Sequence, residues 1–114
     1  MRELLSTTNW SRDPRLVAAL KEPLMRVCAN YLVKEKRKGR ALDRVAHFHL
    51  SNGARVERIN WLADISPKGL RHSAGLMVNY RYRLRDIEAN HEAYSGAGEV
   101  AVSGAVRKLL KPHD

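Results

Sequence analysis

The residues with the clearest chemical potential are two histidines one residue apart, His47 and His49, in the run VAHFHLSNGA. An imidazole has an unperturbed pKa near ~6.5, so it can donate or accept a proton at neutral pH. Two imidazoles on one face of an element can also begin a metal site. The pair is therefore open to four roles: metal binding, nucleic-acid contact, packing in a core, or proton transfer.

The elements that would position this pair are read from the residues around it. Residues 45–50 alternate as a β-strand does, and Asn52-Gly53 is the strongest short signal for a type I′ hairpin turn. A second strand is predicted over residues 54–62. This register places His47, His49 and Arg58 on one face of the hairpin.

The other segments predict a mixed architecture. Residues 13–39 read as helical, starting at Asp13-Pro14, broken or kinked at Pro23, and ending in the basic run KEKRKGR. That run reads as a solvated helix end, with a phosphate-tracking patch as the alternative. Ser66-Pro67 begins a short helix, residues 76–84 alternate as a strand, residues 86–94 form a helical turn or two, SGAG is a loop, and a helix capped by Ser103 spans 103–110. We therefore expect one region over 1–114, of α+β (α/β) class, with helices first, a mainly antiparallel sheet over 45–84, and a C-terminal helix.

The bulk composition limits the partners. Twenty-one Lys and Arg against 12 Asp and Glu give a net charge of +9 and favour an anionic partner. No helix-turn-helix, zinc finger or aromatic RNA-binding signature accompanies that charge, so nucleic acid is not the expected partner. A third metal ligand is not signalled by the spacing of His72, His91 and His113, so no metal is expected.

The compartment is inferred from cysteine content and hydropathy. Cys28 is the single cysteine, which excludes an internal disulfide. No segment approaches the ~20 apolar residues that span a bilayer, and the N-terminus lacks the apolar core of a signal peptide. We expect a cytoplasmic protein without a membrane segment.

Three longer runs resemble one known family. KEPLMRVCANYL, VAHFHLSNGARVERINWLADIS and GLRHSAGLMVNYRYRL, followed by NHEAYSG, are similar to the C-terminal part of malonyl-CoA decarboxylases, over nearly the whole chain from about Trp10 to Leu110. The resemblance implies part of a catalytic domain of acetyltransferase-like (GNAT) fold. It also implies that the histidine of the FHLxNGA motif, here His49, is catalytic. Strand geometry alone made the two histidines equal, and His47 keeps a structural or solvent-facing role.

The resemblance implies conversion of malonyl-CoA to acetyl-CoA and carbon dioxide. The thioester of the substrate can accept the electrons left by the departing carboxylate, so no cofactor is expected. His49 would supply the proton or orient the leaving carboxylate. Sequence does not decide between these two roles.

One departure from the family concerns the partner of this histidine. In the family it works with a serine well upstream, and neither Ser6 nor Ser11 matches that context. We therefore expect a fragment of the enzyme with little activity alone, which associates with the missing upstream half or with itself. The alternative is a non-catalytic basic module that binds nucleic acid or an acidic partner. Solvated roles are expected for Arg58 and Arg81, and core roles for Tyr80, Tyr82 and Trp61.

Overall fold

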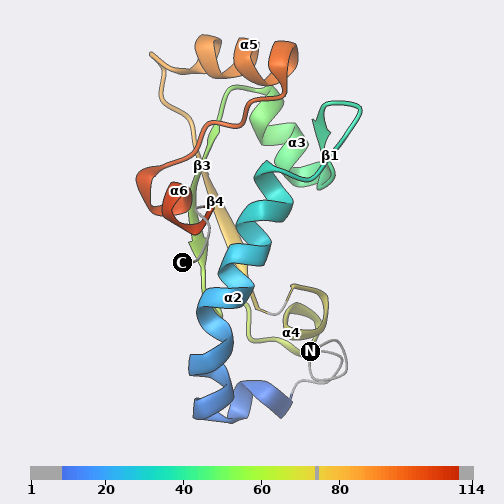
Figure 1. Cartoon of the computed structure of the whole chain (residues 1–114), viewed down its shortest axis with the longest axis vertical. Coiled ribbons are helices and arrows are strands. Elements are labelled where there is room, and N and C mark those ends of the chain that lie inside the picture. Colours follow the sequence, from blue (N-terminus) through green and yellow to red (C-terminus); the bar gives the residue numbers. More distant parts are fainter. Residues whose placement is uncertain (1–8, 74, 111–114) are drawn as a thin grey trace.

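Within residues 9–73 and 75–110, the fold combines one long helix, five shorter helical segments and two small antiparallel sheets (Figure 1). The computed structural model describes residues 9–73 and 75–110. This architecture confirms the predicted α+β class. The elements in chain order are η1 (Asn9–Arg12), α2 (Pro14–Val33), β1 (Lys36–Arg37), β2 (Arg40–Ala41), α3 (Arg44–Ser51), β3 (Arg55–Asn60), α4 (Pro67–Ser73), β4 (Met77–Arg81), α5 (Ile87–Ala97) and α6 (Gly104–Leu110).

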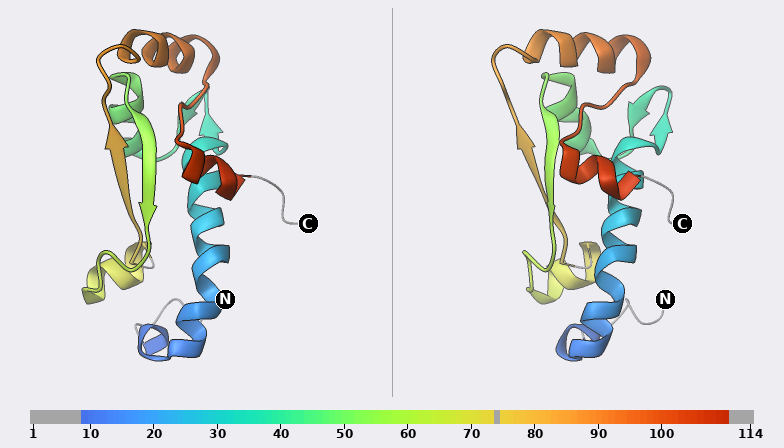
Figure 2. Two further views of the ribbon diagram at one scale, coloured as in Figure 1. Left: turned by 90° about the vertical axis from the view of Figure 1, so that its left-hand side faces the viewer. Right: turned by 60° about the vertical axis from the view of Figure 1, so that its left-hand side comes forward.

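The principal sheet consists of β3 and β4, which lie side by side along the length of α2 (Figure 2). Val56 pairs with Tyr80, and a bulge follows between Val56 and Arg58. Along β4, Val78 and Tyr80 are half-buried, whereas the residues between them are exposed. The predicted alternation of residues 76–84 is therefore correct within β4 but fails at Leu84, which is 93% exposed beyond the strand.

The two outer edges of this sheet differ in whether their backbone groups are paired. On the outer side of β3, the Val56 N–H donates to the Ala101 carbonyl at 2.9 Å, and the Ser103 N–H donates to the Val56 carbonyl at 3.0 Å. The segment before α6 therefore covers this edge. Within residues 9–73 and 75–110, no strand pairs with the outer edge of β4.

The core is built where α2, α3, α5 and α6 meet the sheet. The larger cluster includes Ala46 and Leu50 of α3, Val56 of β3, Tyr94 of α5 and Val106 of α6. A second cluster joins Trp10 and Leu70 to the first half of α2, with Trp61 packed against it as predicted. Burial of these apolar side chains is the main driving force that assembles the elements.

Helix α2 corrects two predictions. It passes through Pro23 without ending there, because Pro23 and Ala19, whose carbonyl loses its intrahelical donor, both lie on the exposed side. It then ends at Val33 rather than at residue 39. The basic run forms the β1–β2 hairpin, whose turn residues Lys38 and Gly39 both have positive φ, of 55° and 76°.

Helix α3 replaces the strand predicted over residues 45–50. Asp43 caps its start by accepting a hydrogen bond from the Ala46 N–H at 2.8 Å, and Asn52-Gly53 ends it, with Gly53 at φ 90°. Ala46 and Leu50, four residues apart, enter the core together. The same Asn-Gly pair that signals a hairpin turn therefore serves as a helix terminus, and β3 pairs with β4 instead.

The remaining helices have clear termini. Ser66 precedes α4, and its Oγ accepts from the Gly69 N–H at 3.0 Å. Helix α5 continues through most of the SGAG segment expected to be a loop and ends at Gly98, which is left-handed at φ 69°. Ser103 caps α6 by accepting from the Val106 N–H at 3.3 Å. Across the described ranges, we find no helix with the length and apolar character needed to cross a bilayer.

Candidate active site

The two histidines lie on opposite sides of α3. Residues two apart on an α-helix are separated by about 200° around the axis. The prediction that His47, His49 and Arg58 share one face is therefore wrong, because it rested on strand geometry. Each histidine instead contacts a different tyrosine, and the two environments can be compared directly.

His49 is held by two tyrosines from the end of β4. Its Nδ1 lies 2.7 Å from the Tyr82 hydroxyl. Its ring stacks on the Tyr80 ring with centroids 4.3 Å apart and planes 18° from parallel, and Phe48 meets it edge-on. One ring nitrogen and one ring face are thus occupied, which fixes the imidazole while it remains partly exposed.

The two tyrosines differ in burial. Tyr80 is half-buried, and burial, with the Asp43 carboxylate as a second cause, raises the pKa of its hydroxyl. Tyr82 is 44% exposed. The expectation that Tyr82 is a core residue is wrong, because β4 has ended and its ring lies beside His49 instead.

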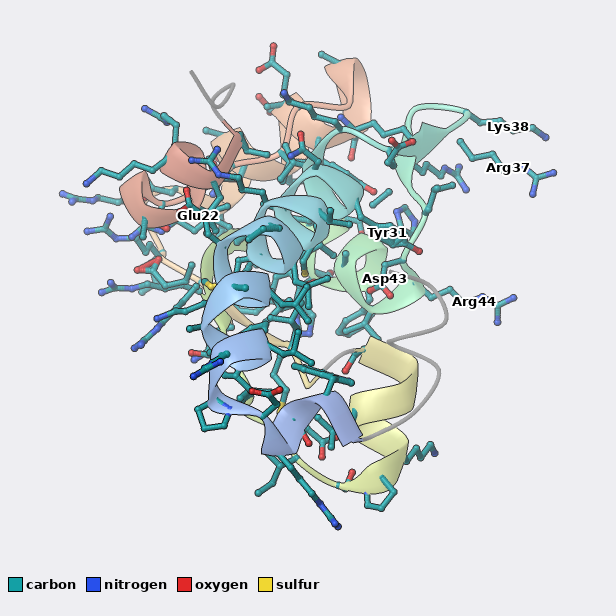
Figure 3. The ribbon with its side chains drawn as sticks, turned by 60° about the horizontal axis from the view of Figure 1, so that its bottom comes forward. Glu22, Tyr31, Arg37, Lys38, Asp43 and Arg44 are labelled. Carbon is teal, nitrogen blue, oxygen red and sulfur yellow. The ribbon has the colours of Figure 1, made fainter. Side chains whose placement is uncertain are left out.

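An apolar groove of about 670 Å³ adjoins this site between α2 and β4. Tyr80 belongs to both, since its ring stacks on His49 and also lines the groove. Tyr31 of α2 and Asp43 line it as well and are labelled in Figure 3. Cys28 lies on its wall, and burial raises the pKa of this thiol to about 11, which keeps it protonated at neutral pH.

His47 lies in a different setting. Its Nδ1 is 2.8 Å from the hydroxyl of Tyr94, which is buried and also accepts a hydrogen bond from the Ala41 N–H at 2.9 Å. This arrangement ties α3, α5 and the β1–β2 hairpin together. A structural contact is therefore present at His47, in line with the role expected for it.

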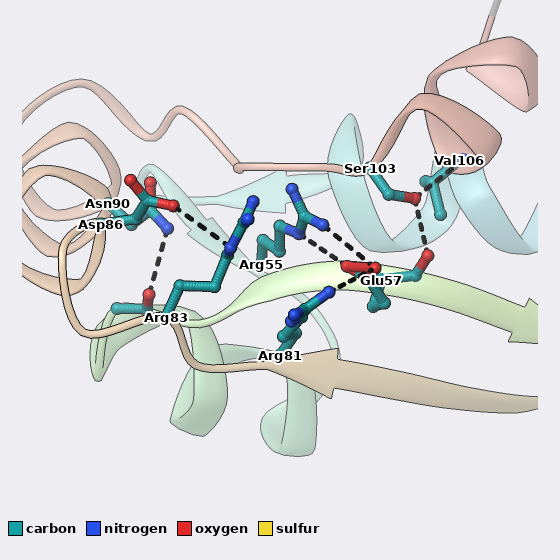
Figure 4. Close-up of polar contacts among 9 residues, drawn as sticks. Arg55, Glu57, Arg81, Arg83, Asp86, Asn90, Ser103 and Val106 are labelled. Atoms are coloured by element: carbon teal, nitrogen blue, oxygen red, sulfur yellow. Dashed lines mark hydrogen bonds and ion pairs between the residues drawn. The ribbon is translucent and has the colours of Figure 1, made fainter.

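The arginines of the sheet are mostly occupied by carboxylates. Arg55 Nε donates to Glu57 Oε2 at 2.6 Å, and Arg81 lies 3.6 Å from the same carboxylate (Figure 4). These hydrogen bonds and charges lower the pKa of Glu57. Arg81 is therefore ion-paired rather than simply solvated, and Arg58 is exposed. Both side chains point away from the face of the sheet that carries Tyr80. Arg81 directly follows Tyr80 along β4, and Arg58 pairs with Asn79, which directly precedes Tyr80, so each lies on the opposite face.

Metal ligands do not gather in the part of the chain that the structure describes. Among the side chains that the structure describes, no three of His, Cys, Asp or Glu come together in a way that could hold a metal ion. Ser6, His113 and the side chain of His72 lie outside what is described.

The chemistry available here is proton transfer. A partly exposed imidazole that a hydroxyl contacts at Nδ1 and a ring supports on one face can exchange a proton through Nε2. Sequence reasoning singled out His49 but missed Tyr80 and Tyr82 as its partners and Tyr94 as the partner of His47. The alternation of residues 76–84 did place Tyr80 and Tyr82 on one face, yet only the helical form of residues 44–51 brings His49 to them.

Comparison with known proteins defines the family. The model of the malonyl-CoA decarboxylase C-terminal domain matches residues 1–114. The mitochondrial malonyl-CoA decarboxylase of Anser anser anser is 49% identical over 110 residues, and that of Rattus norvegicus is 48% identical; each alignment covers 96% of this chain and 22% of the relative. This chain belongs to the malonyl-CoA decarboxylase family and matches its C-terminal domain, as the resemblance predicted.

Solved structures show the same fold. The malonyl-CoA decarboxylase from Rhodopseudomonas palustris is 51% identical, with a TM-score of 0.88 over 95% of this chain and 25% of its own. The one from Agrobacterium vitis is 46% identical, with a TM-score of 0.89 over 96% of this chain and 27% of its own. The chain thus spans about a quarter of the solved structures that it matches.

The comparisons also correct the expected compartment. The curated relatives are named as mitochondrial enzymes, so the prediction of a cytoplasmic protein is wrong. That prediction rested on the absence of recognisable signals in the sequence, which is weak evidence for a compartment. The alternative of a basic module that binds nucleic acid or an acidic partner receives no support from these relatives.

Proposed function

We propose that this chain forms the proton-transfer part of a malonyl-CoA decarboxylase and that His49 is its catalytic residue. The observation that carries the proposal is the imidazole fixed by Tyr82 at Nδ1 and by the Tyr80 ring on one face. Its accessible position suits a group that must reach a substrate. Membership of the family supplies the reaction class.

The proposed reaction needs one proton and no external electron acceptor. The bond between the carboxylate carbon and C2 of the malonyl group breaks, carbon dioxide leaves, and the electron pair passes to the thioester as an enolate. C2 then takes a proton, which gives acetyl-CoA. Hydrogen-bond donors that face the enolate oxygen would stabilise the developing charge.

His49 fits the step that supplies the proton. A Tyr82 hydroxyl that donates to Nδ1 leaves the proton of a neutral imidazole on Nε2, the nitrogen free to meet the substrate. The protonated imidazole carries N–H at Nε2 as well. We therefore assign delivery of the proton to Nε2, with Tyr82 as a positioning residue and the Tyr80 ring as its support.

The other catalytic groups would come from the rest of the decarboxylase polypeptide. The relatives are four to five times as long as the matched part, and the family resemblance places a serine partner upstream of this histidine. We propose that this remainder docks on the outer edge of β4 and in the groove between α2 and β4. Several exposed apolar side chains gather there, namely Val27, Tyr31, Val45 and Met77, and an unpaired strand edge readily accepts another strand.

A chimera tests the function directly. These 114 residues replace the matching quarter of the Rhodopseudomonas palustris chain, and loss of malonyl-CoA is measured beside the unmodified relative and the isolated 114-residue chain. We expect an active chimera and an isolated chain with little or no activity. The chimera with His49→Asn should lose activity while its circular dichroism and elution volume stay unchanged.

Two results would overturn the proposal. The first is a folded chimera that is inactive although the unmodified relative is active. The second is a His49→Asn chimera as active as its parent. Docking is tested separately by light scattering of the isolated chain with the remainder of the relative added: a one-to-one complex supports it, whereas self-association alone or no complex contradicts it.

A further inference from the structure

A second cavity lies on the far side of α3 from His49. It measures about 590 Å³ and is enclosed by the turn of the β1–β2 hairpin, the His47 side of α3 and the last turn of α5. This volume is within the usual range of small-molecule sites. Unlike the groove beside His49, it is lined mainly by polar groups, and none of the described residues that line it is a carboxylate. We refer to it as the hairpin cavity.

Two walls of the cavity, the hairpin turn and the end of α5, pack closely on each other through their backbones. Gly98, the left-handed cap of α5, lies against the hairpin turn so closely that a Cβ at this position would come within 3.1 Å of the Gly39 carbonyl oxygen. A side chain here would be strained by both the positive φ and this contact. The hairpin and α5 are therefore fixed relative to each other, and the Tyr94 hydroxyl adds its hydrogen bond from Ala41.

The charges around the hairpin cavity favour an anion. Lys38 and Arg40 line it, and no carboxylate within the described ranges pairs with either of them. Residues 34–44 contain six Lys or Arg side chains against two carboxylates. Figure 3 shows Lys38, Arg37 and Arg44 projecting from the same side of the molecule. Such a cluster attracts an anionic ligand over several ångströms.

His47 supplies a donor to the same cavity. The Tyr94 hydroxyl accepts from Ala41 and has one proton to donate, and Nδ1 of His47 lies 2.8 Å away. When that proton is donated to Nδ1, the neutral ring carries its N–H at Nε2. The protonated ring carries an N–H at Nε2 as well, so this ring, which lines the cavity, supplies a donor in both of these states. We propose that the hairpin cavity binds a small phosphate-bearing anion through Lys38, Arg40 and His47.

The phosphate group has two possible sources, a free phosphate compound or the phosphates of a CoA thioester. The 114-residue chain is titrated with inorganic pyrophosphate, ADP, CoA and dephospho-CoA at fixed salt, with binding followed by calorimetry and by 15N signals of the histidine rings. We expect the largest shift at the His47 ring signals and a smaller one at His91, whose Nδ1 contacts the carbonyl oxygen of Ser51 at the cavity wall. Tighter binding of CoA than dephospho-CoA identifies the thioester source, and equal binding of pyrophosphate or ADP identifies a free phosphate compound.

Matched charge variants decide whether the cavity or overall charge is responsible. Arg40→Gln should weaken binding about threefold and Lys38→Gln with Arg40→Gln about tenfold, as expected for partly exposed charge-assisted contacts. Lys108→Gln removes the same charge from α6, away from the cavity, and should leave affinity unchanged. Equal weakening by Lys108→Gln, no binding of any probe, or shifts at His91 instead of His47 would each overturn the proposal. The test is independent of decarboxylase activity, and the unmodified chain remains informative where a variant fails to fold.

Discussion

Two histidine–tyrosine pairs occupy opposite sides of the same short helix, and their differences separate a reactive group from a structural one. The distances from Nδ1 to the hydroxyl are nearly equal, 2.7 Å for His49–Tyr82 and 2.8 Å for His47–Tyr94. Tyr94 is 4% exposed and its hydroxyl also accepts a backbone N–H, whereas Tyr82 is 44% exposed. A buried hydroxyl held by a backbone N–H and a half-buried imidazole has little freedom, while a hydroxyl at the surface can follow a change in the protonation of its partner. The same local contact thus suits different tasks because of what surrounds it.

The largest expected effect lies on the His49 side. In the chimera, His49→Asn should reduce kcat/KM by about 10²- to 10⁴-fold, the range for loss of a general acid or base. The measurement is the initial rate of malonyl-CoA consumption. His91→Asn, which changes an exposed histidine of α5, is the matched control and should alter the rate by no more than about twofold. Equal losses in both variants would contradict the distinction.

The groove beside His49 can be examined through Cys28. Burial, with the nearby Asp43 charge as a second cause, raises the pKa of its thiol from 9.0 to about 11. At pH 8 the folded chain should therefore react with iodoacetamide about 100-fold more slowly than the urea-unfolded chain, because its thiolate fraction is lower. The folded rate should rise about tenfold per pH unit until pH approaches that pKa of about 11. Cys28→Ser is the blank, and similar folded and unfolded rates would contradict the expected burial.

The His47–Tyr94 pair should contribute more to the stability of the fold than the His49–Tyr82 pair. Tyr94→Phe leaves the buried Ala41 N–H and the half-buried His47 Nδ1 without their partner, so the free energy of unfolding should fall by about 1–3 kcal/mol. Tyr82→Phe should change it by less than about 0.5 kcal/mol, since its hydroxyl is exposed. Urea unfolding of the two variants measures the difference. Equal destabilisation would remove the contrast between them.

Activity should respond to Tyr82 more modestly than to His49. In the chimera, Tyr82→Phe should lower kcat about tenfold with little change in KM, because the ring remains but the imidazole loses its orienting hydroxyl. The pH profile of kcat should shift with it, which a purely structural role would not cause. His91→Asn serves as the control again, because His91 lies outside both the His49 contacts and the groove. An unchanged profile in Tyr82→Phe would exclude a positioning role.

The smallest expected effect concerns the helix that carries both histidines. Asp43→Ala removes the N-terminal cap of α3 and should lower the free energy of unfolding by about 1 kcal/mol. Asp43→Ser retains a capping oxygen and should recover most of the loss. Both are measured by urea unfolding. A loss in the serine variant as large as in the alanine variant would show that the Asp43 hydrogen bond to Ala46 is not the cause.

Much of the local structure was predictable because its signals are short in range. Asp13-Pro14, Ser66-Pro67 and Ser103 start helices because each supplies an oxygen to nearby N–H groups, a property of the residue itself. The alternation of exposed and half-buried side chains along β4 could also be predicted from the sequence. The form of residues 45–50 could not, because the same six-residue segment fits a strand period of two and also the four-residue spacing that buries Ala46 with Leu50.

The sequence by itself determined the family, the identity of the candidate histidine and the positive charge of the chain. Only the tertiary structure decided on which side of which element His49 lies and which hydroxyl it contacts. The reason is physical: packing of α3 against β3 and α5, together with the stacking of His49 on Tyr80, stabilises the helical form of residues 44–51, and these partners are distant in the chain. Because residues two apart lie on opposite sides of a helix, His47 and His49 then lie in two different environments.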